Sequence, residues 1–129
     1  MARMKVLVNC SAVAAGGAMG AVARYLIALL CAQTFGAGFP VGTFVINITG
    51  SFILGWFVAA TSARGNVSDA TRLAVAVGFV GAYTTFSTYM YESNALLKDG
   101  AGIKAMVNLA GSVIVGLIAV RLGAWAGAR

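Results

Sequence analysis

The chain of 129 residues is 60% hydrophobic and 9% charged, and its mean hydropathy is +0.92. Soluble domains carry roughly a quarter of their residues as charged ones, so this composition excludes them and predicts an integral membrane protein surrounded by lipid. The net charge of +6 comes from basic residues that are spread singly along the chain and form no patch for a polyanion. We therefore expect no nucleic-acid partner.

Four apolar segments follow one another, at residues 6–31, 41–60, 72–97 and 103–125. Each is about 20 residues or longer, which is enough for a helix to cross the hydrocarbon core of a bilayer. The basic start and small residues of the first segment can mimic a cleaved signal peptide, but the rest of the chain is equally apolar and would leave nothing soluble to secrete. The sequence predicts one all-α domain over residues 1–129, with four transmembrane helices.

An even number of spans places both termini on one side of the membrane. An excess of Lys and Arg marks the cytoplasmic side, and we expect the termini there because more basic residues fall on their side. Those residues are Arg3, Lys5, Arg64, Arg72, Arg121 and Arg129, against Lys98 and Lys104 on the other side, with Arg24 as a further candidate there.

The third apolar segment contains a run, Gly78 to Glu92, that is rich in hydroxyls and aromatic rings and ends in a carboxylate. Two glycines followed by paired threonines weaken helix propensity over this short run. Irregular backbone at membrane depth is tolerated only where protein buries it or water reaches it. We predict a third helix that is broken near its middle at Gly78 and Gly81, with freed carbonyls available to a ligand. The alternative is an unbroken helix whose glycines permit close packing.

Two polar residues stand alone in the first two apolar segments. Asn47 lies in the middle of the second segment, where its amide either joins helices or lines a path that water can enter. Arg24 lies near the end of the first segment, where we favour a side chain that reaches the interface over an anion attractor at a pore mouth. In the fourth segment, Asn108 and Ser112 are expected to face something other than lipid.

The inventory of reactive groups is small, since the chain has no histidine and its acids are Asp69, Glu92 and Asp99. No metal-ligand cluster or nucleophile–base pair can be assembled from these residues, so an enzyme is not expected. A four-span proton-coupled multidrug exporter needs an acid deep in the membrane, and Glu92 lies near the end of its helix. The exporter is therefore the alternative function, and a non-conducting packing subunit is a third.

Neutral hydrogen-bond donors are abundant, and they accompany a pair of rings. Phe86 and Tyr89 are three residues apart and share one helix face, and the positive edges of their rings can approach an anion. A small, strongly hydrated anion needs its water shell replaced by many donors, which hydroxyls, an amide and ring edges can supply. The alternative is that both rings are ordinary packing residues.

The runs Gly42–Asn47 (GTFVIN) and Gly81–Tyr89 (GAYTTFSTY) resemble the signature of the CrcB/Fluc fluoride channels. The similarity covers the whole chain, including a glycine-rich first helix that ends in an arginine, and Gly111-Ser112 in the fourth. The resemblance implies a fluoride-selective passive channel of the cell (inner) membrane that lets fluoride leave the cytoplasm and lowers its toxicity. It also implies an antiparallel, dual-topology homodimer with two pores and a structural sodium ion at the dimer centre.

The resemblance assigns roles to individual residues. Gly81 and Thr84 would supply backbone carbonyls to sodium, whereas the pore-mouth role of Arg24 rests on its position in the first segment alone. Tyr89 stands where the family usually has phenylalanine, which leaves conductance and selectivity open. The charge imbalance leaves open a heterodimer of two oppositely inserted homologues. The predicted fluoride pathway consists of Asn47, Thr85, Phe86, Ser87, Thr88, Tyr89 and Ser112.

Overall fold

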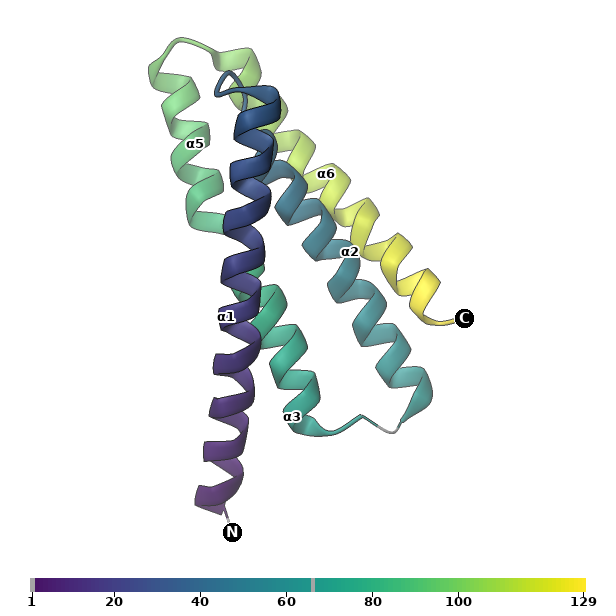
Figure 1. Cartoon of the computed structure of the whole chain (residues 1–129). Coiled ribbons are helices and arrows are strands. Elements are labelled where there is room, and N and C mark those ends of the chain that lie inside the picture. Colours follow the sequence, from purple (N-terminus) through teal and green to yellow (C-terminus); the bar gives the residue numbers. More distant parts are fainter. Residues whose placement is uncertain (1, 66) are drawn as a thin grey trace.

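The computed structural model describes residues 2–65 and 67–129, which form helices joined by short connections. Figure 1 shows the chain running up α1, down α2, up again through α3 to α5, and down α6. The elements are α1 (Ala2–Phe35), α2 (Val41–Arg64), α3 (Asp69–Arg72), the π-helix η1 (Leu73–Val80), α4 (Gly81–Tyr83), α5 (Phe86–Lys98) and α6 (Gly102–Gly127). Elements α3 to α5 together make the third of four stretches long and apolar enough to cross a membrane. The chain is a multi-pass membrane protein.

The helices extend beyond the apolar segments, because polar residues at their ends continue the helical backbone. Helix α1 begins at Ala2 and continues to Phe35. Gly36 directly follows the end of α1 and Gly65 directly follows the end of α2, and both adopt a positive φ that other residues rarely adopt. Arg24 consequently lies eleven residues before the end of α1, about 16 Å along the helix axis. Its predicted place near the end of the first helix is wrong.

Glycines set the closest approaches between helices. A Cβ atom at Gly16 or Gly20 of α1 would overlap backbone carbonyl groups of η1, and a Cβ at Gly78 of η1 would meet the carbonyl oxygen of Val13. The same arrangement joins α2 to α6, where Gly123 fits against the carbonyl of Phe52. Small residues that let backbones touch are typical of helix packing in membranes. Gly78 therefore permits close packing between α1 and η1, which is the role that the alternative interpretation gave to this glycine.

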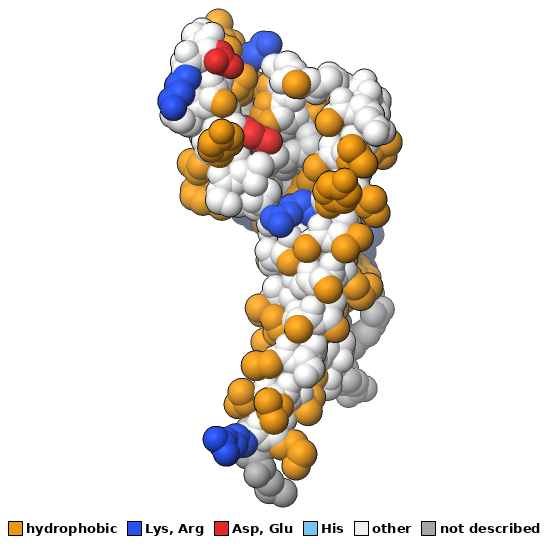
Figure 2. All heavy atoms as spheres, turned by 60° about the vertical axis from the view of Figure 1, so that its left-hand side comes forward, with side chains coloured by type: hydrophobic (Ala, Val, Ile, Leu, Met, Phe, Trp, Pro, Cys, Tyr) orange, Lys and Arg blue, Asp and Glu red, His pale blue; other side chains and the backbone are white. Residues whose placement is uncertain are grey.

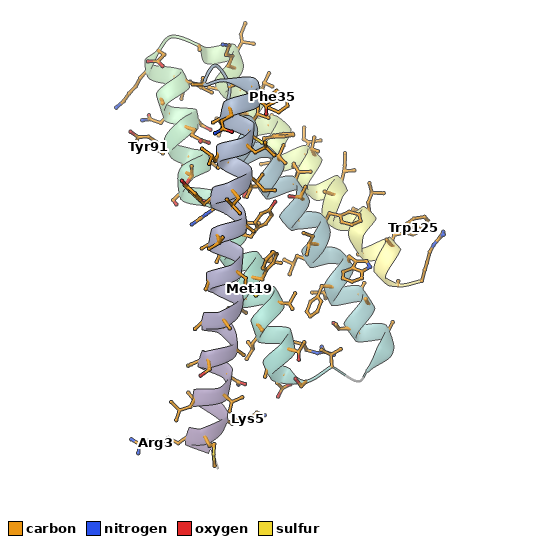
Figure 3. All side chains as sticks on the ribbon, in the orientation of Figure 1. Arg3, Lys5, Met19, Phe35, Tyr91 and Trp125 are labelled. Carbon is orange, nitrogen blue, oxygen red and sulfur yellow. The ribbon has the colours of Figure 1, made fainter. Side chains whose placement is uncertain are left out.

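Most large apolar side chains lie on the outside of the single chain. Figure 2 shows hydrophobic side chains along the visible face of the molecule, and Figure 3 places Met19 midway along α1, with Tyr91 and Trp125 on the outer sides of α5 and α6. The largest fully buried side chains are Ile46 and Asn108. Such an exterior suits contact with lipid or with another apolar protein surface.

The lower ends of α1 and α3 are joined by polar contacts. Lys5 and Asp69 form a salt bridge of 3.0 Å whose side chains are both largely exposed. The hydroxyl of Ser68 accepts a hydrogen bond of 3.1 Å from the backbone N–H of Thr71 and so begins α3. These contacts fix where the third span starts beside α1.

Candidate functional site

The third span is broken at Thr84 and Thr85, whose backbones are extended. Before the break, the hydroxyl of Thr84 donates to the carbonyl of Val80 at 2.8 Å. After it, Oγ1 of Thr85 accepts from the backbone N–H of Thr88 at 3.3 Å and begins α5. The Thr84 hydroxyl shares the Val80 carbonyl with the N–H of Thr84, whereas the Thr85 hydroxyl replaces a backbone partner of Thr88 and so helps to make the interruption tolerable. The predicted interruption of the third helix is seen in part, as a bend, and it lies three residues after Gly81, where the side chain of Thr85 rather than a glycine supplies an alternative bond.

Asn47 of α2 holds the extended backbone of Thr85 with two hydrogen bonds. Its Nδ2 donates to the Thr85 carbonyl at 3.0 Å, and its Oδ1 accepts from the Thr85 N–H at 2.8 Å. These two bonds also fix the orientation of the amide, since a reversed amide would place two donors against each other. Asn47 therefore joins two helices at the break, as one of its two proposed roles required.

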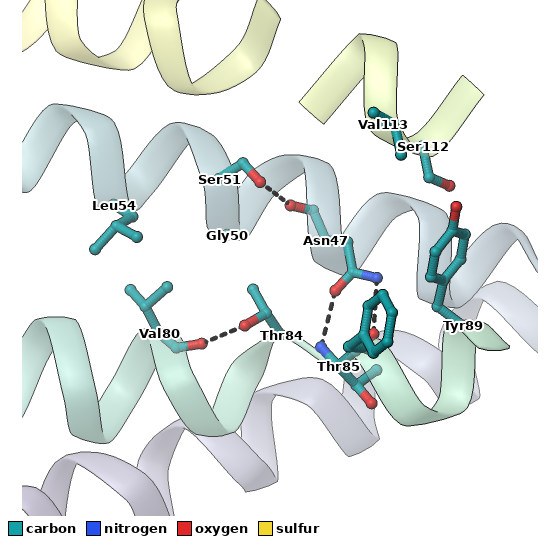
Figure 4. Close-up of a pocket in the computed structure, with 11 residues that line it drawn as sticks. Asn47, Gly50, Ser51, Leu54, Val80, Thr84, Thr85, Tyr89, Ser112 and Val113 are labelled. Carbon is teal, nitrogen blue, oxygen red and sulfur yellow. Dashed lines mark hydrogen bonds between the residues drawn. The ribbon is translucent and has the colours of Figure 1, made fainter. Parts of the chain in front are cut away.

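A cavity of about 330 Å³ lies beside this contact, between α2, the broken third span and α6. Figure 4 shows Asn47, Thr85, Tyr89 and Ser112 around it. Asn47 thus borders a cavity as well as joining helices. The complete lining is Asn47, Gly50, Ser51, Leu54, Val80, Thr84, Thr85, Phe86, Tyr89, Ser112 and Val113.

Of the predicted pathway residues, Ser87 and Thr88 lie outside the cavity lining and are exposed on α5. Arg24 is also outside the lining. The other five, from three different helices, are brought together. Gly50 was not predicted, although it lies three residues after Asn47 and so on the same side of α2. A Cβ at Gly50 would overlap the side chain of Thr84, so this glycine makes room for the break.

The two rings of the site have different surroundings. The centroids of Phe86 and Tyr89 are 6.0 Å apart, with the ring planes tilted by 58°. Phe86 is 74% exposed, whereas Tyr89 is 7% exposed. The hydroxyl of Tyr89 donates to the carbonyl of Leu109 on α6 at 2.7 Å. The Phe86 ring is therefore largely exposed, whereas the Tyr89 ring is buried and bonded to α6.

The lining combines apolar and polar side chains, and it carries no ionisable acid or base other than the phenol of Tyr89. The hydroxyl of Ser51 is committed to the carbonyl of Asn47, at 2.7 Å. The buried hydroxyl of Ser112, by contrast, has no hydrogen-bond partner within the described chain. The cavity can therefore offer neutral hydrogen-bond donors to a small polar solute or ion, but it lacks the groups for general acid–base chemistry.

The break also changes the partners of two carbonyl groups. The N–H of Thr85, which would bond to the Gly81 carbonyl in a continuous helix, donates to Asn47. The N–H of Thr88, which would bond to the Thr84 carbonyl, donates to Oγ1 of Thr85. Gly81 is exposed on the surface of the single chain. The N–H groups that would bond to these two carbonyls in a continuous helix are therefore engaged elsewhere.

Comparison with known proteins places the chain in a family. A family model described as CrcB-like protein, Camphor Resistance (CrcB), matches residues 11–124. The chain is 43% identical over 117 residues to a protein of Acidobacterium capsulatum named fluoride-specific ion channel FluC, covering 91% of the chain and 94% of that protein.

Proteins of the same name in Chloroflexus aurantiacus and Trichormus variabilis are 44% and 46% identical to the chain. These matches cover 89% and 87% of the chain, and 91% and 82% of the respective relatives. The family model matches most of the sequence, and the relatives align over most of their own length. Both comparisons thus indicate the same family. The chain therefore belongs to the CrcB family.

Proposed function

We propose that the chain forms a passive, fluoride-selective channel. The observation that carries this proposal is the cavity at the break. Neutral polar side chains from three helices and two aromatic rings of α5 border it. The relatives named as fluoride-specific ion channels, rather than as enzymes, support the same conclusion.

Fluoride is small and strongly hydrated, so it enters a membrane protein only where other donors replace its water. The free hydroxyl of Ser112 and the ring edges of Phe86 and Tyr89 are such donors at the cavity. A fixed cation in the lining would hold the anion too tightly for rapid passage, and the lining contains none. Ser87 and Thr88 would extend the path along the exposed side of α5, and Arg24 would attract the anion from outside the cavity.

The carbonyls of Gly81 and Thr84 fit a structural sodium ion. Neutral oxygen ligands suit a hard monovalent cation, and both carbonyls have lost their helical partners at the break. Two copies of the chain would supply four such oxygens. When bound, sodium would neutralise carbonyl dipoles that are costly to leave bare in a bilayer.

The assembly that brings two Gly81 residues together is an antiparallel homodimer in the inner membrane, with one cavity in each subunit. The exposed position of Gly81 and the apolar outer surface support a partner of this kind. Such a channel lets fluoride run down its electrochemical gradient and so leave a cytoplasm in which it has accumulated.

The proposal is tested with the purified protein in liposomes loaded with potassium fluoride. A fluoride electrode should record rapid efflux when a potassium ionophore is present, and efflux that stalls early when it is absent. Efflux of an organic cation that depends on a proton gradient, without fluoride movement, would favour the multidrug exporter. Protein that assembles and moves neither solute would be the packing subunit.

A further inference from the structure

An apolar groove of about 520 Å³ lies on the outer surface of the contact between α2 and α6. It faces away from the cavity at the break, because the groove and the cavity take their α2 residues from opposite sides of that helix. Among the described residues that line it, Thr49 alone is polar, and its hydroxyl is engaged with the Val45 carbonyl at 2.7 Å. The walls are formed mainly by Ile48, Phe52 and Ile53 of α2 and by Val115, Ile118 and Leu122 of α6.

The side of α6 that lines the groove continues to an aromatic residue and a basic one. Val115, Ile118, Leu122 and Trp125 follow one another at spacings of three or four residues, so they share one side of the helix. Figure 3 shows Trp125 near the end of α6. Arg129 follows the helix end, and its guanidinium carbon lies 3.6 Å from the centre of the Trp125 ring.

A second tryptophan, Trp56 of α2, lies beside this end of the groove. A Cβ atom at Gly123 or Gly127 of α6 would meet backbone atoms of Trp56, so Trp56 lies at the same level of the helix pair as Trp125. The two side chains are 44% and 58% exposed. Tryptophans are enriched at the level where a membrane protein meets lipid headgroups. The groove therefore leads from an apolar lining to the headgroup level.

Two arginines at this end of the groove have no acidic partner in the described chain. Arg121 is exposed and lies one helical turn before Trp125, and Arg129 stacks on the Trp125 ring. Among the described residues, the one salt bridge joins Lys5 to Asp69, at another place in the molecule. A guanidinium that stacks on a ring still presents N–H groups at its edge, and such paired donors suit phosphate oxygens.

We propose that this groove binds an anionic phospholipid, with an acyl chain between α2 and α6 and the phosphate headgroup at Arg121 and Arg129. The apolar lining alone would not select among lipids, since all their chains are similarly apolar. The headgroup makes the selection, because basic residues near the membrane surface attract anionic lipid. The site is separate from the cavity at the break and does not depend on fluoride conduction.

Trp56 and Trp125 are the two tryptophans of the chain, so their fluorescence reports on this site. The protein is reconstituted in phosphatidylcholine vesicles that contain a small, fixed fraction of lipid with brominated acyl chains, which quench tryptophan on contact. The brominated lipid is either phosphatidylglycerol or phosphatidylcholine with the same chains. Phosphatidylglycerol should quench more strongly, with an affinity for the site that is about fivefold higher for each arginine that the headgroup contacts.

The variant that carries both Arg121→Gln and Arg129→Gln should reduce quenching by phosphatidylglycerol to the level of phosphatidylcholine. The matched control, Arg3→Gln with Lys98→Gln, removes the same charge from exposed side chains of α1 and α5 and should keep the wild-type preference. Equal quenching by the two lipids in the wild type would overturn the proposal, whatever the variants do. A preference that survives the loss of both arginines, or that the control also loses, would contradict binding at these residues. Tryptophans that neither lipid quenches would show that protein, such as a second copy of the chain, covers the groove instead.

Discussion

Within the third span, Leu73–Tyr83 and Thr84–Ser93 meet neighbours of different kinds. The first segment lies against α1, where Gly16 and Gly20 bring the two backbones into contact. The second is held by side-chain hydrogen bonds from other helices, above all those of Asn47 and Asn108. Close packing of glycines fixes a distance but leaves no polar group free. Hydrogen bonds to an interrupted backbone fix an orientation, and a cavity lined in part by polar side chains lies beside them, so function is expected in the second segment.

The largest effect is expected at the second segment, from Asn47→Leu. Leucine keeps similar bulk, but it leaves the N–H and the carbonyl of Thr85 without partners, at about 1–3 kcal/mol for each group. We expect lower thermal stability and loss of fluoride efflux from liposomes. Normal efflux from a variant that elutes at the wild-type volume would show that the break does not need this amide.

The first segment is tested with Gly16→Ala and its neighbour Gly17→Ala. A methyl group at Gly16 would overlap the carbonyl of Ala74, whereas one at Gly17 would make ordinary contacts. Overpacking of this kind costs about 1–3 kcal/mol, so Gly16→Ala should lower the melting temperature and Gly17→Ala should not. Equal melting temperatures for the two variants would argue against the close contact of α1 with η1.

A third comparison, within the second segment, is between the variants Phe86→Leu and Tyr91→Leu. It separates an effect on fluoride conduction from a general effect of losing an exposed ring on α5. Both rings lie on α5 and are similarly exposed, at 74% and 76%, but only Phe86 borders the cavity. If the edge of the Phe86 ring contacts the anion, its loss should slow fluoride efflux by about tenfold, which corresponds to about 1.4 kcal/mol. Tyr91→Leu should conduct normally, and equal rates in the two variants would remove Phe86 from the pathway.

The smallest effect is expected outside both segments, from Lys5→Ala. The salt bridge of Lys5 with Asp69 is largely exposed, and exposed pairs contribute about 0–1 kcal/mol. The melting temperature should fall slightly, and the difference from wild type should shrink further at high salt. A large loss of stability would mean that this pair, rather than glycine packing, holds α1 to the third span.

The sequence predicted the four spans and the existence of a break, because hydropathy and helix propensity are properties of neighbouring residues. The position of the break was not predictable in the same way. It depends on Asn47, which pairs with a residue 38 positions later in the chain. The role of Gly50 likewise appears only when Thr84 is placed against it.

Two further differences have local causes. The position of Arg24 was misjudged because residues 32–35 continue α1 beyond the predicted apolar segment, to Phe35. Ser87 and Thr88 follow Phe86 in the motif and remain predicted residues of the pathway beyond the cavity. On α5 they fall on a side that does not border the cavity. A motif gives the residues of a site in order, but the helix turn decides which of them face it.

The most direct test of the account is the reversal potential of the current that the wild-type protein carries across a planar bilayer with a fluoride gradient. A passive fluoride channel predicts reversal at the fluoride equilibrium potential, which is about 59 mV for a tenfold gradient of a monovalent ion. Adding a pH gradient should leave this value unchanged. A reversal potential that moves with the pH gradient, or that follows chloride instead of fluoride, would contradict passive fluoride conduction.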